Sequence, residues 1–233
     1  MTDRRGRFIT VEGGEGVGKT TQVRLLMAAL RRRGIAARAT REPGGSPGGE
    51  AIRRLLLEGE GTRWNAMSEA LLLVAARHDH VTRLISPALA EGGWVVCDRF
   101  ADSTLAYQGY GKGIGIAELN ALHRLAIGDF APDLTVILDL PVDIGLARAA
   151  ARSTADRFER LDRDFHESLR RGFRRIAADN PVRCVLIDAS GDRAAVHRAV
   201  IEAAGERLGV QLAFGSDSLA TIGEGKGPAS PKG

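Results

Sequence analysis

A glycine-rich segment near the N-terminus has the residue types and spacing of a phosphate-binding loop. Residues 13–20 read Gly-Gly-Glu-Gly-Val-Gly-Lys-Thr and fit the pattern G-x-x-x-x-G-K-[ST] at every fixed position. Lys19 would reach the β- and γ-phosphates of a nucleotide, and the Thr20 hydroxyl would bind Mg²⁺. The alternative is a glycine-rich turn that binds nothing. The predicted nucleotide-binding residues are Gly13, Gly14, Glu15, Gly16, Val17, Gly18, Lys19 and Thr20.

The flanking sequence favours the phosphate-binding interpretation. An apolar, strand-like run at 8–11 precedes the loop, and a helix-like run at 21–33 follows it. Backbone N–H groups and a helix N-terminus would then face one small volume, which suits an anion with several oxygens.

Asp98 and Arg99 directly follow another apolar run, at 94–97. We expect both at the carboxyl edge of a sheet, beside the phosphate-binding loop. Asp98 could hold Mg²⁺ together with Thr20, and Arg99 could grip a phosphate with two N–H groups. The competing interpretation is that Asp98 caps a short helix that begins near Ser103.

Two further segments allow both a functional and a structural interpretation. The turn at 41–45, Arg-Glu-Pro-Gly-Gly, is stiff at Pro43, and by itself it is equally well explained as an ordinary turn. Residues 148–160 carry four arginines and interrupt the helical pattern between two helices. This stretch is either a mobile basic flap or a solvated face in an arginine-rich chain.

Short apolar runs alternate with helical stretches along the chain. We expect strands at 8–11, 36–40, 94–97, 134–138 and 184–187. Helices are predicted at 21–33, from near Ser68, which can act as the N-cap, toward Pro87, and at about 159–178 and 193–208. The predicted fold class is α/β, a five-stranded parallel sheet flanked by helices on both faces.

The composition is that of a globular protein of one domain. The chain has 233 residues, 44% of them hydrophobic and 27% charged, with a net charge of +4. Only four of the 33 basic residues are lysine, and aromatic residues make up 5%, so no nucleic-acid surface is expected. Cys97 and Cys184 lie in apolar runs, as buried thiols do. Without a signal-peptide core or an 18-residue apolar run, we expect a cytoplasmic location and no membrane contact.

Four ordered segments of the chain resemble the bacterial thymidylate kinases, P-loop proteins of the nucleoside monophosphate kinase family. They are residues 11–21, Val-Glu-Gly-Gly-Glu-Gly-Val-Gly-Lys-Thr-Thr; residues 40–45, Thr-Arg-Glu-Pro-Gly-Gly; residues 98–100 with 103–109; and Pro-Asp-Leu at 132–134. Ala-Ala-Arg at 75–77 fits as well, and the match spans roughly residues 7–210. The resemblance implies transfer of the γ-phosphoryl group of ATP to dTMP with Mg²⁺, in a homodimer with this fold.

The resemblance also assigns site residues. Lys19 and the loop amides would hold the ATP phosphates, with Thr20 and Asp98 at the metal. The residues implied for dTMP are Glu15 at the sugar 3′-hydroxyl, Pro43 in the pocket floor after a cis bond from Glu42, Arg77 at the base edge, Arg99 at the phosphate, and Ser103, Thr104 and Tyr107 along deoxyribose and thymine. Because the loop holds no arginine, the flap would supply the catalytic one, Arg152 or Arg157, with Arg148 behind them.

The chain departs from the family pattern at two positions. Leu73 stands where a phenylalanine commonly stacks on thymine; as the eighth residue implied for dTMP, it can still cover the ring face, but the aromatic contribution of about 0.5–1.5 kcal/mol would be missing. Phe100 stands where tyrosine or histidine is frequent. A kinase for another nucleoside monophosphate, or a nucleotide-gated switch, is the alternative function.

The domain prediction places one kinase domain at 1–214, with the flap at about 148–160. Gly, Ser, Pro and Lys dominate residues 215–233, which we expect to be a disordered tail.

Overall fold

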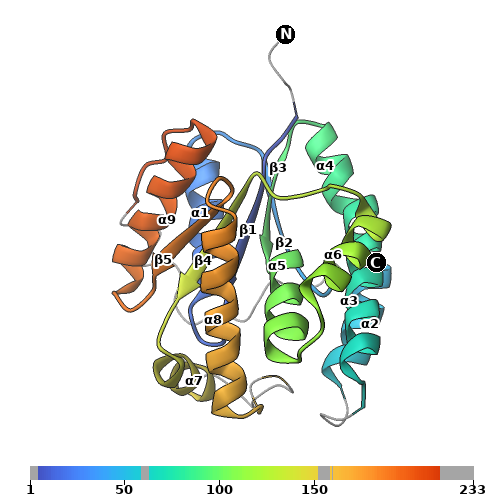
Figure 1. Cartoon of the computed structure of the whole chain (residues 1–233). Coiled ribbons are helices and arrows are strands. Elements are labelled where there is room, and N and C mark those ends of the chain that lie inside the picture. Colours follow the sequence, from blue (N-terminus) through green and yellow to red (C-terminus); the bar gives the residue numbers. More distant parts are fainter. Residues whose placement is uncertain (1–4, 59–62, 152–157, 159, 216–233) are drawn as a thin grey trace.

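The computed structural model describes residues 5–58, 63–151, 158 and 160–215. It contains a five-stranded parallel sheet in the order β2-β3-β1-β4-β5, which confirms the predicted fold class (Figure 1). The strands are β1 Phe8–Gly13, β2 Ala37–Arg41, β3 Trp94–Asp98, β4 Leu134–Asp139 and β5 Cys184–Asp188.

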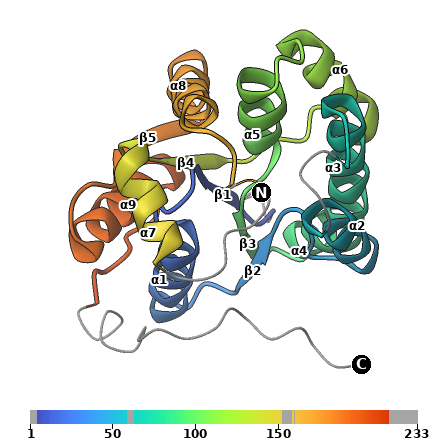
Figure 2. The same cartoon turned by 90° about the horizontal axis from the view of Figure 1, so that it is seen from below.

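Helices connect these strands and flank the sheet. They are α1 Lys19–Arg32, α2 Pro47–Leu57, α3 Ala66–His80, α4 Ser86–Ala90, α5 Ala101–Thr104, α6 Ile116–Ile127, α7 Val142–Ala150, α8 Arg163–Asp179 and α9 Arg193–Leu208, with π-helical segments η1 Val81–Ile85 and η2 Leu105–Gly111. Seen from below, α1 and α9 lie on one side of the sheet, and α8, α5, α6 and α3 lie on the other (Figure 2). No helix within the described ranges is both long and apolar enough to cross a membrane.

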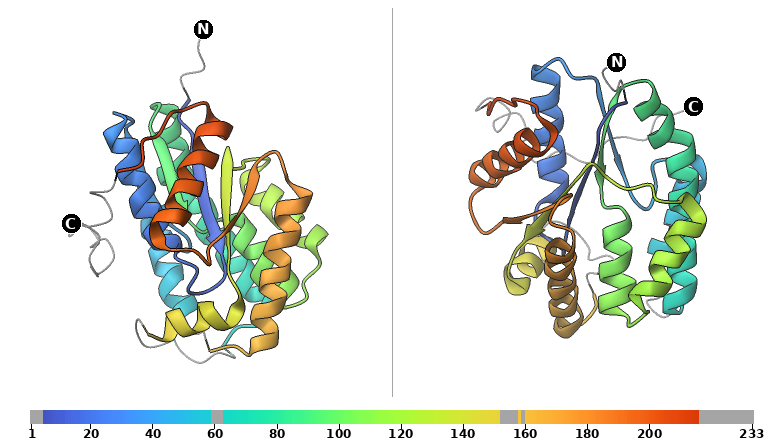
Figure 3. Two further views of the ribbon diagram at one scale, coloured as in Figure 1. Left: turned by 90° about the vertical axis from the view of Figure 1, so that its left-hand side faces the viewer. Right: turned by 45° about the horizontal axis from the view of Figure 1, so that its top comes forward.

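Alternation along the strands builds a hydrophobic core on each face. Ile9 and Val11 of β1 point toward α1 and α9, which pack side by side (Figure 3). Phe8 points the other way and packs with η1, α4 and Phe100. The two predicted buried thiols, Cys97 and Cys184, are both buried on this second side.

Two predicted helix starts were wrong, because another residue supplies the cap. Asn65 Oδ1 accepts a hydrogen bond from the Ser68 N–H at 2.8 Å, so Asn65 and not Ser68 caps α3. The helix predicted from residue 159 begins at Arg163, after the Asp162 carboxylate accepts from Phe165 N–H at 2.7 Å. Helices α2 and α6 were not predicted from the sequence, whereas α7 is the helix expected before the interruption at 148–160.

Helix α7 lies against the phosphate-binding loop with backbone contacting backbone. A Cβ on Gly16 would stand 1.8 Å from the Gly145 carbonyl oxygen, and a Cβ on Gly145 would stand 2.5 Å from the oxygen of Glu15. Only glycine allows this approach at both positions. The loop is therefore braced by the helix that leads into residues 152–157, the centre of the predicted flap, which lie outside the described residues.

Candidate active site

The phosphate-binding loop connects β1 to α1 at the carboxyl edge of the sheet. Gly13, Gly16 and Gly18 all have positive φ, and Gly18 precedes α1 without any side-chain capping bond. The first amides of α1 therefore have no capping side chain, which is the arrangement expected of a loop that binds an anion.

Lys19 folds back over this loop. Its ammonium group donates to the carbonyl oxygens of Gly13 at 3.1 Å and Gly14 at 2.5 Å, and the side chain is buried. Burial and repulsion from Arg99 lower the pKa of Lys19 to about 8, although nearby carboxylates oppose the shift. The positive charge is held close to the surface where loop amides would meet phosphate.

Thr20 and Asp98 meet beside the loop. The Thr20 hydroxyl donates to Asp98 Oδ2 at 2.6 Å, because β3 is the direct neighbour of β1. The alternative role for Asp98 is wrong, since α5 begins after Phe100 and has no side-chain cap. Two hard oxygen donors therefore lie together, as Mg²⁺ ligation requires.

Arg99 joins the loop to the pocket beside it. Its backbone has φ +70°, which is rare for a residue with a Cβ. The guanidinium donates to Gly13 O at 3.1 Å, to Ser103 Oγ at 3.3 Å and to Glu15 Oε1 at 2.9 Å. It also lies over the Tyr107 ring, 4.9 Å from the centroid.

Glu15 is the point where this cluster converges. Burial would raise the pKa of its carboxyl, but Arg99, Lys19 and a hydrogen bond from the Tyr107 hydroxyl outweigh burial and lower that pKa to about 2. Glu15 is therefore an anion at neutral pH and acts as a hydrogen-bond acceptor only.

A buried ion pair fixes Arg77. Its Nε donates to Glu42 Oε2 at 2.8 Å, and Nη2 donates to Thr104 Oγ1 at 2.8 Å and to Phe100 O at 3.2 Å. His80 contacts the other Glu42 oxygen at 3.0 Å. The sequence analysis did not single out Glu42 or His80 as site residues, although Glu42 precedes Pro43 through the expected cis bond.

All eight residues predicted for the acceptor nucleotide line one pocket with about 580 Å³ of empty space. They come from four separate parts of the chain that meet at the carboxyl edge of the sheet. They are Glu15, Pro43, Leu73, Arg77, Arg99, Ser103, Thr104 and Tyr107.

The same pocket contains residues that the sequence analysis missed. Arg53 lines it while donating to Pro43 O at 2.8 Å, and Phe158 packs edge-on against Tyr107 with centroids 5.6 Å apart. Gln108 lines it too, and its Oε1 is buried without a hydrogen-bond partner among the described residues. The Ala-Tyr-Gln-Gly run in the 103–109 segment was the available signal for Gln108.

Phe100, the second departure from the family pattern, is buried and packs against Phe8, with ring centroids 5.0 Å apart. Its ring lies 5.1 Å below the Arg77 guanidinium and supports it. Leu73, the first departure, lines the pocket wall from α3.

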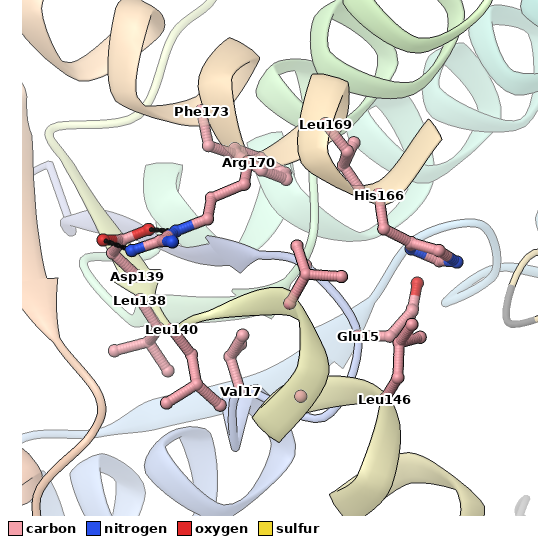
Figure 4. Close-up of a pocket in the computed structure, with 13 residues that line it drawn as sticks. Glu15, Val17, Leu138, Asp139, Leu140, Leu146, His166, Leu169, Arg170 and Phe173 are labelled. Carbon is pink, nitrogen blue, oxygen red and sulfur yellow. Dashed lines mark hydrogen bonds and ion pairs between the residues drawn. The ribbon is translucent and has the colours of Figure 1, made fainter. Parts of the chain in front are cut away.

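A second, smaller pocket lies on the other side of the loop, between α7 and α8 (Figure 4). Arg170 of α8 points into this region and pairs with Asp139 at the end of β4 through bonds of 2.7 and 2.9 Å. This pair ties α8, which follows the predicted flap, to the sheet edge. Arg148, the second choice after Arg152 and Arg157 for the catalytic arginine, lies in α7 and donates to Ala189 O at 3.3 Å. The candidates Arg152 and Arg157 lie outside the described residues.

A parallel sheet with a phosphate-binding loop at its central strand, and an acceptor pocket beside it, defines a P-loop kinase of the nucleoside monophosphate type. The thymidylate kinase family model matches residues 11–200. The thymidylate kinase of Rhodopseudomonas palustris is 57% identical over 208 residues, covering 88% of this chain and 90% of that protein. The one from Afipia carboxidovorans is 54% identical over 211 residues, covering 89% and 92%.

A solved structure agrees with these relatives. The crystal structure of thymidylate kinase from Ehrlichia chaffeensis superposes with a TM-score of 0.70 at 36% identity, covering 85% of this chain and 98% of that one. The chain belongs to the thymidylate kinase family, whose members are ATP-dependent nucleoside monophosphate kinases.

Proposed function

We propose that this chain transfers the γ-phosphoryl group of ATP to dTMP, giving dTDP and ADP. The observation that carries the proposal is the position of Arg99, which contacts the phosphate-binding loop at Gly13 O and lines the acceptor pocket. A phosphate held by this guanidinium would lie next to the phosphates held by the loop. Donor and acceptor are thereby brought together, which is most of what phosphoryl transfer requires.

The acceptor needs little activation. A phosphate monoester has a second pKa of about 6, so dTMP is mostly a dianion at neutral pH and is already nucleophilic. The obstacle is repulsion between two polyanions, and Lys19 and Arg99 supply positive charge where they would meet. We propose that Arg152 or Arg157 of the flap adds charge at the transferred group, as the resemblance implies.

Thr20 and Asp98 are the proposed ligands of Mg²⁺. Their oxygen atoms lie 2.6 Å apart beside the loop, and a hydroxyl with a carboxylate is a donor set that this hard cation prefers. When bound, Mg²⁺ would neutralise charge on the phosphate oxygens of ATP.

Replacing Asp98 with asparagine tests this assignment. We expect the Mg²⁺ concentration for half-maximal activity to rise about tenfold or more, because a neutral amide binds a hard cation less tightly than a carboxylate. The measurement is a Mg²⁺ titration at saturating ATP and dTMP, with Asp139→Asn as a carboxylate control at the end of a different strand. An unchanged Mg²⁺ requirement in Asp98→Asn would remove this residue from the metal site.

We propose that Arg77, Thr104 and Gln108 read the thymine base. Arg77 lines the pocket and is held in place by Glu42 and Thr104, so its remaining N–H groups would donate to a base carbonyl. The buried Gln108 Oε1 can accept from the N3–H of thymine. Leu73 would cover the face of the ring.

A homodimer is proposed from an apolar surface. Leu55, Met67, Leu71 and Leu125 are exposed on α2, α3 and α6, with Leu71 at 49% and Leu125 at 86%. Helix α3 packs against both α2 and α6, and the three helices lie on one side of the molecule (Figure 2). Exposed large apolar side chains on neighbouring helices are typical of an interface between subunits. Since α3 also carries Arg77, dimerisation would brace the acceptor pocket.

The variant Leu71→Asp tests the dimer. A charge on this face is expected to shift the protein from dimer to monomer at micromolar concentration, because the carboxylate would have to be desolvated in the interface. Light scattering after size-exclusion chromatography measures the mass, and Ile144→Asp on α7, at 42% exposure, is the matched control. A monomeric unsubstituted protein would refute the proposal directly.

The reaction itself is tested by an ADP-release assay with Mg²⁺ and ATP across dTMP, dUMP, dCMP, CMP, AMP and GMP. We expect kcat/KM to be highest for dTMP. A higher kcat/KM for AMP, GMP or CMP would identify that nucleotide as the acceptor in place of dTMP. Negligible release of ADP with every monophosphate would refute the kinase proposal.

A further inference from the structure

Two helical stripes contact each other at the acceptor pocket, whose lining includes Leu73, Arg77, Thr104 and Gln108. Glu69, Leu73 and Arg77 are spaced four residues apart along α3 and therefore share one face. On the other side, Thr104 bonds Arg77, while Gln108 and Lys112 both bond Glu69. The first stripe thus contains Arg77, which is proposed to contact the base, and Glu69, whose carboxylate is fully buried.

The Glu69 carboxylate determines how the Gln108 side chain is oriented. Gln108 Nε2 donates to Glu69 Oε1 at 2.7 Å, and Lys112 Nζ donates to the same oxygen at 2.7 Å. A carboxylate beside an ammonium group accepts hydrogen bonds and donates none. The amide nitrogen is therefore held on the Glu69 side, which leaves Oε1 as the end of the amide that can meet a ligand.

Orientation matters because pyrimidine bases differ at N3. Thymine and uracil carry a hydrogen at N3 and need an acceptor there, whereas cytosine has a lone pair and needs a donor. A glutamine free to rotate by 180° could serve either kind of base. A glutamine fixed with its oxygen toward the pocket accepts only the first kind.

We propose that Glu69 is a positioning residue that sets the pyrimidine specificity of this kinase by fixing the Gln108 amide, without itself touching the nucleotide. The inference rests on the proposed reading of the base by Gln108. It extends that proposal by explaining how Gln108, whose amide can both donate and accept hydrogen bonds, distinguishes thymine from cytosine. Lys112 supplies the counter-charge that allows the carboxylate to be buried.

The test replaces Glu69 with glutamine. The new amide can both donate and accept, so Gln108 gains a second orientation that suits cytosine. We expect the ratio of kcat/KM for dTMP over dCMP to fall about tenfold or more, since a site that leaves its polar group unpaired rejects a substrate by at least that factor. The ratio for dTMP over dUMP should stay within twofold, because both bases carry N3–H.

Matched variants separate orientation from general damage. Asp102→Asn removes another buried carboxylate, the partner of Arg183 at 2.7 and 2.8 Å, and should leave the dTMP over dCMP ratio within twofold. In a Gln108→Met background, Glu69→Gln should not change the ratio any further. Glu69→Asp retains the charge but withdraws it by one methylene, so an intermediate ratio is expected even if the amide variant does not fold.

The outcomes distinguish the two levels of the proposal. If Gln108→Met leaves KM for dTMP unchanged, Gln108 does not read the base and the proposed contact fails. If Gln108→Met raises that KM but Glu69→Gln keeps the wild-type ratio, the contact stands and the positioning role of Glu69 is overturned. The positioning role is also overturned if Asp102→Asn lowers the dTMP over dCMP ratio as much as Glu69→Gln does. The same holds if Glu69→Gln still lowers this ratio in the Gln108→Met background.

Discussion

Replacing Lys19 with alanine is expected to lower kcat by about a thousandfold while the protein still folds. Lys19 is buried over the loop, and its ammonium group lies on the carbonyl oxygens of Gly13 and Gly14. Preorganised charge at a site where negative charge moves between oxygens contributes roughly 10²–10³-fold or more to kcat. Rapid-quench or coupled-assay kinetics at saturating dTMP and ATP measure the effect.

A control for Lys19 uses its charge. Lys19→Arg keeps a cation but changes its shape, so we expect it to retain more activity than the alanine variant and less than the unsubstituted enzyme. Thermal unfolding of both variants, followed by circular dichroism, checks the fold. A kcat within tenfold of wild type in Lys19→Ala would show that the loop amides alone hold the phosphates.

The lowered pKa of Lys19 predicts how activity depends on pH. In the free enzyme the ammonium group loses its proton as pH rises through about 8, and the neutral amine no longer attracts phosphate. We therefore expect kcat/KM for ATP to decline above pH 8, whereas kcat at saturating ATP stays level to higher pH because bound phosphate stabilises the charge.

The lowered pKa of Lys19 also affects stability, because a group that binds protons differently in the folded and unfolded states makes the free energy of unfolding depend on pH. An unfolded lysine has a pKa of 10.5, so between about pH 8 and 10.5 the unfolded chain binds more protons than the native one at this position. The contribution of Lys19 to the free energy of unfolding should increase with pH in that window. Comparing Lys19→Met with the unsubstituted protein isolates it.

Removal of the Arg99 guanidinium should produce the second large loss of activity, and this loss should appear in kcat/KM for dTMP. We expect kcat/KM for dTMP to fall about 10³-fold in Arg99→Asn. Two charge-assisted hydrogen bonds to a phosphate account for that factor at roughly 1.5–3 kcal/mol each. Asparagine is chosen because it tolerates the positive φ of this residue, so that the backbone of the turn is preserved.

The ATP side provides the internal control for Arg99. KM for ATP should change only a few-fold, because the loop and Lys19 remain. Arg99→Lys keeps one charge without the planar fork and should recover part of the loss. If the loss appeared in KM for ATP while KM for dTMP stayed normal, Arg99 would belong to the donor side and the proposed orientation of the two nucleotides would be reversed.

Much of the fold and site could be predicted from the sequence because parallel strands end at one edge. A motif that follows a buried strand must lie at that edge. The sequence therefore already predicts that the loop at 13–20 and Asp98 lie next to each other, as the pairing of β1 with β3 requires. The same rule brought Thr20 and Asp98 to hydrogen-bonding distance. Helix existence was predictable where apolar periodicity was strong, but helix starts at Asn65 and Asp162 depended on single capping bonds.

The partners of the buried charges could not be predicted. Glu42 and Arg77 are separated by 35 residues along the chain, and Glu69 and Gln108 by 39. Such pairs form only when α3 packs against the turn after β2 and against η2, and no local pattern encodes that approach. Glycine at 145 likewise reads as an unremarkable helical residue until α7 is seen against the loop.

By itself, therefore, the sequence predicted the class of chemistry of this protein, because the type of residues 13–20, 98 and 99, their spacing and their position after a strand are typical of phosphate and metal binding. Only the tertiary structure decided how the acceptor pocket is held, through the buried contacts of Arg77 with Glu42 and of Gln108 with Glu69. The physical reason is that hydrogen bonding acts over about 3 Å in space, whatever the separation along the chain.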